Sequence, residues 1–168
     1  MRSRIVAGNW KLHGDHAFAH ALMDAIVAAR RPAGVDLVVL PPLPYLAGLA
    51  GHYGPQGIDF GAQDVSANEK GAYTGEVSAR MLADVGARYG LVGHSERRQY
   101  HGEDSALVAR KFMAARAAGL VPILCVGETL QQREAGQTQF RIESQLQPVL
   151  DLGGAAAFDG AVIAQTGS

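Results

Sequence analysis

Short runs of apolar, β-branched residues alternate along this chain with segments in which apolar residues recur every three or four positions. Runs of the first kind predict strands covered on both faces, and segments of the second kind predict helices with one apolar face. The strand-like runs occupy residues 5–7, 35–40, 58–60, 91–92, 121–125 and 161–164. Repeated strand–helix units with short joints predict parallel strands joined by right-handed crossovers.

The helical segments have recognisable beginnings and ends. Asp15 is a good N-cap for the first segment, and Gly119 is a good left-handed end for the third. The apolar positions that define the segments are Phe18, Leu22 and Ile26, then Val77, Met81 and Val85, then Val108, Phe112 and Ala115, and finally Ile142, Leu146 and Leu150. Residues 41–44 (Pro-Pro-Leu-Pro) predict a rigid turn out of the second strand.

Polar side chains gather where the predicted strands end. They are Asn9 and Lys11 after the first run, Gln63 after the third, His94 after the fourth and Glu128 after the fifth. Several polar strand ends on one rim are expected of a (β/α) barrel, whose active sites lie on the carboxyl face. An open doubly wound sheet normally has a glycine-rich phosphate turn after its first strand, and this chain has Asn-Trp-Lys there. The pattern therefore favours a barrel, formed as a single domain over residues 1–168.

His94 ends the fourth predicted strand, and Ser95 and Glu96 directly after it are typical of a helix start. The N–H groups and positive dipole end of that helix disfavour a second proton on the imidazole. We therefore expect a neutral, proton-donating histidine. Taken alone, this segment also fits a structural histidine beside a surface turn.

The connection from Ala62 to Gly75 is much longer than its neighbours. Loops of this length in compact domains usually have a function. The residues by themselves fit two interpretations equally, an arm that docks into a partner subunit or a mobile surface excursion.

The 168 residues are 48% hydrophobic, with 15 basic and 16 acidic groups and a formal net charge of -1. This composition predicts a soluble domain without a nucleic-acid or membrane partner. No apolar stretch approaches the ~20 residues of a spanning helix, and the opening apolar run is too short for a secretion signal. We therefore expect a cytoplasmic protein.

Three smaller groups of residues need no chemical role. Cys125 is the one cysteine, which excludes an intrachain disulfide and predicts a buried apolar residue. The histidines at 13, 16 and 20 have helical spacing, but that helix face is expected to be solvated, so we predict no metal site. Glu103 and Asp104 predict the acidic start of a helix, with Arg97 as an ion-pair partner for them.

Four motifs, in this order and spacing, resemble the triosephosphate isomerase family. They are residues 8–11 (Gly-Asn-Trp-Lys), residues 63–64 (Gln-Asp) leading to 71–76 (Gly-Ala-Tyr-Thr-Gly-Glu), residues 93–98 (Gly-His-Ser-Glu-Arg-Arg) and residues 125–129 (Cys-Val-Gly-Glu-Thr). The resemblance covers residues 4 to about 164. It implies a (β/α)8 TIM barrel, here incomplete with about six parallel strands. It also implies a glycolytic and gluconeogenic homodimer that interconverts dihydroxyacetone phosphate and D-glyceraldehyde 3-phosphate without a cofactor.

The resemblance also implies roles for particular residues. Lys11 would supply positive charge to the substrate, Asn9 would donate a hydrogen bond, and His94 would polarise the carbonyl as a neutral electrophile. This family is itself a well-known example of a histidine kept neutral by a helix N-terminus. Ser95, Glu96 and Cys125 would support the site. The loop from Ala62 to Gly75 would dock into the second subunit, with Gln63, Tyr73, Thr74 and Gly75 as dimer contacts.

The sequence departs from the family after the sixth strand. Family members continue there with a Tyr-Glu-Pro-Val-Trp type sequence whose glutamate is the catalytic base, whereas residues 164–168 here are Ala-Gln-Thr-Gly-Ser. Thr166 stands roughly where that glutamate would fall, and an alcohol cannot replace a carboxylate as the base. Strands seven and eight, whose loops hold the substrate phosphate, have no counterpart either.

Two interpretations follow for a chain truncated after its sixth strand. By family it is an aldose–ketose isomerase whose remaining rim includes Asn9, Lys11 and His94. The alternative is a catalytically inactive barrel fragment that self-associates or binds anions weakly. Six strands leave apolar edges on the first and sixth, so we expect assembly or aggregation of such a chain.

Overall fold

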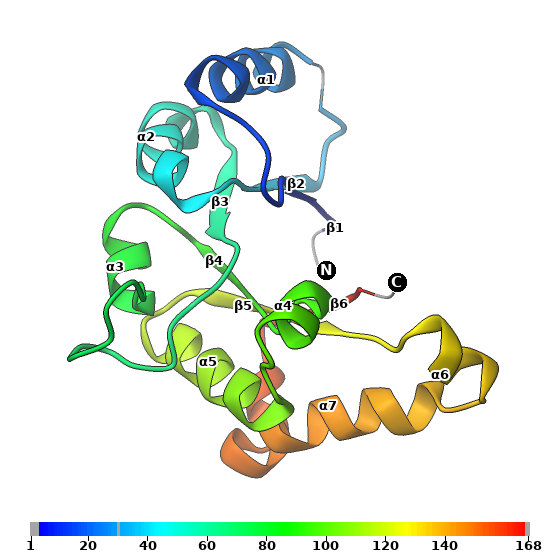
Figure 1. The fold of residues 1–168 in the computed structure, drawn as a ribbon. Helices are drawn as coiled ribbons and strands as arrows, with labels where there is room; N and C mark the ends of the chain where they lie inside the picture. Colours follow the sequence, from blue (N-terminus) through cyan, green and yellow to red (C-terminus); the bar gives the residue numbers. More distant parts are fainter. Residues whose placement is uncertain (1–3, 30, 167–168) are drawn as a thin grey trace. The chain divides into compact units, whose positions relative to one another are not determined.

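The computed structural model describes residues 4–29 and 31–166. Residues 1–3 at the start of the chain, and Gly167 and Ser168 of the C-terminal sequence that departs from the family, lie outside the described residues. Six strands are found in the described part and are ordered as in the sequence (Figure 1). They are β1 (Arg4–Asn9), β2 (Val35–Leu40), β3 (Asp59–Ala62), β4 (Tyr89–Val92), β5 (Val121–Val126) and β6 (Val162–Gln165).

Helices connect these strands and confirm the predicted α/β class. The α-helices are α1 (His16–Ala28), α2 (Leu43–Tyr53), α3 (Ala79–Asp84), α4 (Ser95–Tyr100), α5 (Ser105–Ala117), α6 (Leu130–Glu134) and α7 (Thr138–Gly153). Two 3-10 helices, η1 (Gly54–Gln56) and η2 (Ala155–Phe158), complete the described part. None of the helices in the described ranges is both long enough and apolar enough to span a bilayer.

The described residues form two compact units. The first unit holds the residues up to Gln63 together with Met81–Tyr89, and the second holds Asp64–Arg80 together with the residues from Gly90 onward. Each unit contains strands and helices of its own. The expectation of one domain over the whole chain remains a prediction.

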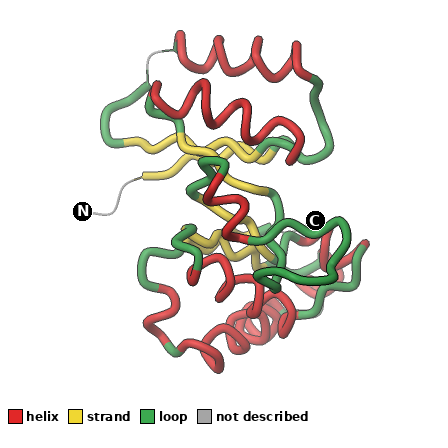
Figure 2. The backbone as a smooth tube through the Cα atoms, turned by 90° about the vertical axis from the view of Figure 1, so that its left-hand side faces the viewer, coloured by secondary structure: helices red, strands yellow, loops and turns green. Residues whose placement is uncertain are grey.

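In the first unit, β1 and β2 pair in parallel from Arg4 opposite Val35 to Asn9 opposite Leu40. β2 pairs in parallel with β3 as well. Helices α1 and α2 pack on each other, and α2 packs against β3 (Figure 2). Gly61 is required in β3, because a Cβ atom there would lie 2.6 Å from Leu40 Cδ2 and 2.8 Å from the main-chain oxygen of Tyr89.

Helix α1 begins as predicted, since the Asp15 carboxylate accepts the N–H of Phe18 at 2.8 Å. Helix α2 was missed. The prolines that we interpreted as a turn extend into the first turn of α2, with Pro42 as its N-cap and Pro44 inside that turn. Proline is compatible with a first turn because the N–H groups there have no intrahelical acceptor. The helical pattern expected from Val77 onward begins only at Ala79, as α3.

In the second unit, β5 and β6 pair in parallel from Ile123 opposite Val162 to Val126 opposite Gln165. Helix α5 packs on β5 and on α7. Its N-cap is Asp104, whose carboxylate accepts the N–H of Leu107 at 2.7 Å, and its end is followed by Gly119 in the left-handed conformation. β5 is almost entirely buried, whereas Val6 of β1 and Ile163 of β6 are 55% and 52% exposed.

Candidate active site

In the first unit, Asn9 and Lys11 lie at the carboxyl end of β1. The Asn9 side-chain oxygen accepts the main-chain N–H of Lys11 at 2.9 Å. Lys11 has φ +52°, and among the described residues no other side-chain-bearing residue has a positive φ. A non-glycine residue keeps this conformation only where its surroundings fix it. The hydrogen bond from Asn9 is one such constraint.

Gln63 supplies the second constraint on Lys11. Its side-chain amide donates to the main-chain oxygen of Lys11 at 2.9 Å and to that of Leu40 at 2.8 Å. One side chain after β3 thus joins the chain segments that leave β1 and β2. We expected Gln63 to be a dimer contact, and that expectation is untested. Its hydrogen bonds within the first unit could not be read from the sequence.

His94 lies in the second unit, where the chain passes from β4 into α4. Gly93 makes the turn with φ +72°, and a Cβ atom on it would lie 2.7 Å from Val108 Cγ1. His94 is then the N-cap of α4, which begins at Ser95, and the residue is only 9% exposed. The predicted position of His94, at a strand end and immediately before a helix, is confirmed.

The first turn of α4 fixes the tautomer of the His94 ring. The main-chain N–H of Glu96 donates to His94 Nδ1 at 3.2 Å. A main-chain N–H can only donate, so Nδ1 offers its lone pair and a proton on this ring belongs on Nε2. The Glu96 carboxylate also lies 3.4 Å from Nδ1 and would suit a protonated Nδ1. We assign the lone pair to Nδ1 because the main-chain contact is shorter and is fixed by the helix.

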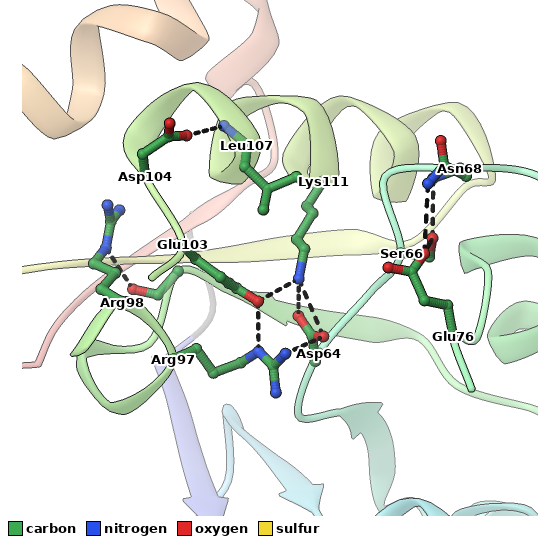
Figure 3. Close-up of polar contacts among 11 residues, drawn as sticks. Asp64, Ser66, Asn68, Glu76, Arg97, Arg98, Glu103, Asp104, Leu107 and Lys111 are labelled. Atoms are coloured by element: carbon green, nitrogen blue, oxygen red, sulfur yellow. Dashed lines mark hydrogen bonds and ion pairs between the residues drawn. The ribbon is translucent and has the colours of Figure 1, made fainter. Parts of the chain in front are cut away.

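A partly buried cluster of ion pairs lies beside α4 in the second unit (Figure 3). The Lys111 ammonium is 2.6 Å from Glu103 and 2.9 Å from Asp64. Arg97 contacts the same two carboxylates, at 2.8 Å for Glu103 and 3.2 Å for Asp64. Burial raises the pKa of Glu103, but hydrogen bonding and the charges of Lys111 and Arg97 outweigh burial, so its pKa lies below the ordinary value.

The sequence predicted only part of this cluster. The pairing of Arg97 with Glu103 and the helix start at Asp104 are confirmed. Lys111 was missed, although a signal existed. Lys111 follows Val108 by three positions and precedes Phe112 on the apolar face of α5, where a charge must have a partner.

The long loop between β3 and α3 is closed by hydrogen bonds where it leaves Asp64 (Figure 3). Ser66 donates its hydroxyl to the Glu76 carboxylate, and this hydrogen bond lowers the pKa of Glu76. Asn68 donates its main-chain N–H to the Ser66 hydroxyl at 3.0 Å. Tyr73, Thr74 and Gly75 are exposed at the far end of the loop. Their role as dimer contacts remains a prediction.

Two further residues that we expected to support the site lie in the second unit. Ser95 is the partly buried first residue of α4. Cys125 is fully buried in β5, and burial raises the pKa of its thiol to about 11.

Thr166, after β6, continues the strand pairing by donating its N–H to the main-chain oxygen of Val126 at 2.8 Å. Within the described ranges, no three or more His, Cys, Asp and Glu side chains are grouped so that they could hold a metal ion.

The end of β5 is held by side chains of α6 and α7 that sequence reasoning did not connect to it. Gln145 of α7 donates to the main-chain oxygen of Gly127 at 2.9 Å and accepts the Gly127 N–H at 2.8 Å. The buried Glu128 carboxylate accepts from Arg133 Nε at 2.8 Å and from the Thr138 hydroxyl at 3.1 Å, and chiefly the Arg133 hydrogen bond lowers its pKa. Its second oxygen has no hydrogen-bond partner among the described residues.

Each unit therefore holds electrophilic groups of its own. The first unit holds an amide and an ammonium on a fixed backbone turn. The second holds an imidazole whose Nε2 is the donor. Such groups stabilise negative charge that develops on a carbonyl oxygen when a proton leaves the neighbouring carbon.

Known proteins with similar sequences identify the family of this chain. Residues 4–165 match the family model of triosephosphate isomerase. The triosephosphate isomerase of Stenotrophomonas maltophilia (strain K279a) is 68% identical over 164 residues, which cover 98% of this chain and 65% of that protein. The triosephosphate isomerase of Xanthomonas campestris pv. campestris (strain 8004) is 65% identical with the same coverage. The chain thus spans about 65% of the length of these relatives.

The family match and the six strands in sequence order together confirm the predicted fold class, an incomplete (β/α)8 TIM barrel. They also confirm the resemblance drawn from the four motifs, because the matched region includes all of them. The relatives are named as isomerases. This chain therefore belongs to the triosephosphate isomerase family.

Proposed function

We propose that the protein to which this chain belongs interconverts dihydroxyacetone phosphate and D-glyceraldehyde 3-phosphate by proton transfer through an enediolate. The observation that carries the proposal is the hydrogen bond from the Glu96 N–H to His94 Nδ1. It leaves Nε2 as the donor, which is the form an uncharged imidazole needs to polarise a carbonyl. The high identity to named isomerases supports the same reaction.

In this proposal, three residues act on the substrate. His94 donates from Nε2 to the developing enediolate oxygen. Lys11 supplies positive charge to the substrate's oxygens and phosphate, and Asn9 donates a further hydrogen bond. Donors that are already oriented stabilise the enediolate without reorganisation during the reaction. The backbone hydrogen bonds around Lys11 and the helix start after His94 support such preorganisation.

Removal of the carbon-bound proton is assigned to no residue among 1–168. In the family this base is a glutamate that follows the sixth strand, and Thr166 cannot act in its place. We propose that no cofactor or metal takes part, and that the protein works in the cytoplasm as a homodimer assembled through the loop from Ala62 to Gly75. Support for the dimer comes from the exposed far end of that loop and its hydrogen-bonded base.

A second candidate function is favoured by one observation. Val6 and Ile163, in the first and last strands, are largely exposed. A polypeptide of these 168 residues alone would associate through such strands without turning over substrate. Such a polypeptide corresponds to the alternative given in the sequence analysis, a catalytically inactive barrel fragment that self-associates.

One experiment separates the two functions. The intact mass of the protein purified from its source is measured, and the same sample is assayed for isomerisation in both directions and sedimented. A mass above 17.7 kDa, turnover and a dimer support the isomerase. A mass of 17.7 kDa with no turnover and sedimentation beyond a dimer supports the fragment. Full activity at 17.7 kDa would show that a residue among the 168 serves as the base. That result would contradict the proposal that the base is a glutamate outside these residues.

A further inference from the structure

Arg98 is half-buried in the second unit and contacts three parts of it. Its guanidinium donates from Nε to the main-chain oxygen of Gly93 at 2.8 Å. It also donates from Nη1 to the Ser105 hydroxyl at 3.0 Å and from Nη2 to the main-chain oxygen of Cys125 at 3.3 Å. The side chain thus joins the residue before His94 to the start of α5 and to β5.

The backbone of Arg98 contacts the same place as its side chain. Its main-chain N–H donates to the main-chain oxygen of His94 at 3.1 Å. The carbonyls before and after the His94 α-carbon are therefore both hydrogen-bonded to Arg98, one by the guanidinium and one by the main chain. The Arg97 N–H also donates to the His94 oxygen, at 2.9 Å. Because these two peptide groups set the φ and ψ angles of His94, Arg98 helps to determine the direction in which the imidazole leaves the backbone.

The acceptors of this half-buried guanidinium are all uncharged. Two are main-chain oxygens and one is a hydroxyl, and none is a carboxylate. Burial lowers the pKa of Arg98. By contrast, the neighbouring Arg97 contacts two carboxylates. A planar guanidinium can hold three acceptors in fixed directions, and lysine cannot do the same.

Gly93 fits closely against this guanidinium. A Cβ atom on Gly93 would lie 2.9 Å from Arg98 Nη2, in addition to its close approach to Val108. The left-handed turn at Gly93 and the guanidinium therefore form one packed unit directly before His94. A shift of Arg98 would be transmitted to the imidazole.

We propose that Arg98 is a positioning residue for His94, holding the peptide groups on both sides of the histidine so that its imidazole is oriented for the isomerisation. Arg98 itself touches no reacting atom in this proposal. The inference rests on the proposed function for its kinetic consequences. Its structural consequence, a fixed environment of the His94 ring, can be measured without turnover.

The test uses Arg98→Lys in the protein at its natural length, with Arg110→Lys, an exposed arginine of α5, as the matched control. Histidine labelled with 15N reports both ring nitrogens, and His94→Gln identifies the His94 signals. We expect the His94 ring signals to move in Arg98→Lys while those of the other histidines stay in place. We also expect kcat to fall about 10- to 100-fold with KM within twofold. Free guanidinium should restore part of kcat to Arg98→Ala.

Several results would overturn the proposal. They are unmoved His94 signals, a kcat within twofold of the parent, or a shift common to all the histidines, which would indicate a general structural role. If Arg98→Lys fails to fold, Ser105→Ala replaces it, because this change removes one acceptor of the guanidinium and leaves the contact to Gly93. We then expect a smaller shift of the ring signals, confined to His94. Unmoved His94 signals in Ser105→Ala would disprove the positioning role of Arg98. A parent without turnover refutes the proposed function, and the ring signals still decide the role of Arg98.

Discussion

Glu96 donates its main-chain N–H to Nδ1 of His94 across 3.2 Å. Residues two apart in the sequence thereby decide which ring nitrogen can donate. The contact depends on α4 beginning at Ser95 and on the left-handed turn at Gly93. The orientation of the imidazole is consequently a property of the local chain, and it can be tested locally.

Replacing His94 with glutamine should lower turnover more than substrate binding. The amide can still donate a hydrogen bond, but it lacks the imidazole's geometry and proton-transfer chemistry. We expect kcat to fall about 10²- to 10⁴-fold with a small change in KM, measured by steady-state kinetics. His101→Gln, at the exposed end of the same helix, should leave both constants unchanged. An unaltered kcat in His94→Gln would remove His94 from the mechanism.

Replacing Lys111 with methionine should destabilise the protein strongly. The change leaves Glu103 and Asp64 without the ammonium that now lies 2.6 Å and 2.9 Å away, and the side chains of Lys111 and Glu103 are each 5% exposed. We expect a loss of about 3–5 kcal/mol in the free energy of unfolding in urea. Adding Glu103→Gln to this variant should recover part of the loss. Arg110→Met on the exposed face should change stability by less than about 0.5 kcal/mol.

The lowered pKa of Glu103 predicts a pH dependence of stability. A carboxylate whose pKa is lower in the folded than in the unfolded protein stabilises the fold at any pH above its unfolded pKa, which is near 4.5 here. This stabilisation is lost as the pH falls through the pKa of the folded protein. The stability difference between the parent and Glu103→Gln should therefore be largest near neutrality and shrink below about pH 4.5. Unfolding in urea between pH 7 and pH 3 measures it. Glu134→Gln, at an exposed site, should show no such trend.

Gly93→Ala and Gly136→Ala should differ in cost although their φ angles are nearly equal, +72° and +70°. A Cβ atom on Gly136 meets no atom within 4 Å, so only the strained φ should count, at about 1 kcal/mol. On Gly93 the Cβ would lie 2.7 Å from Val108 Cγ1, and overpacking should add about 1–3 kcal/mol. Thermal unfolding compares the two. Equal costs would show that the β4–α4 turn adapts freely.

The predictable parts of the fold are those controlled by local chemistry. The β-branched runs located all six described strands, and Asp15 capped α1 as expected from its side chain. Helix α2 was missed because Pro42 and Pro44 were interpreted as a turn, although proline also suits a helix start. The motifs placed His94 and Asn9 at strand ends correctly for the same local reason.

The contacts that organise the site's surroundings join residues far apart in the sequence. Gln63 contacts Lys11 across 52 positions, and Lys111 contacts Asp64 across 47. No periodicity or motif identifies such partners, since the fold alone brings them together. The buried position of Lys111 on α5 was the one readable signal, because an unpaired ammonium there would cost several kcal/mol.

The peptide groups on both sides of Lys11 are already engaged, one by Asn9 and the other by Gln63. When a molecule binds to the Lys11 ammonium, only the side-chain torsions of Lys11 therefore have to become ordered. The main chain at this residue is ordered already. Ordering a residue's backbone costs about 1–2 kcal/mol at room temperature, so this cost is met during folding, before any encounter. The turn after β1 consequently makes recognition at Lys11 entropically inexpensive.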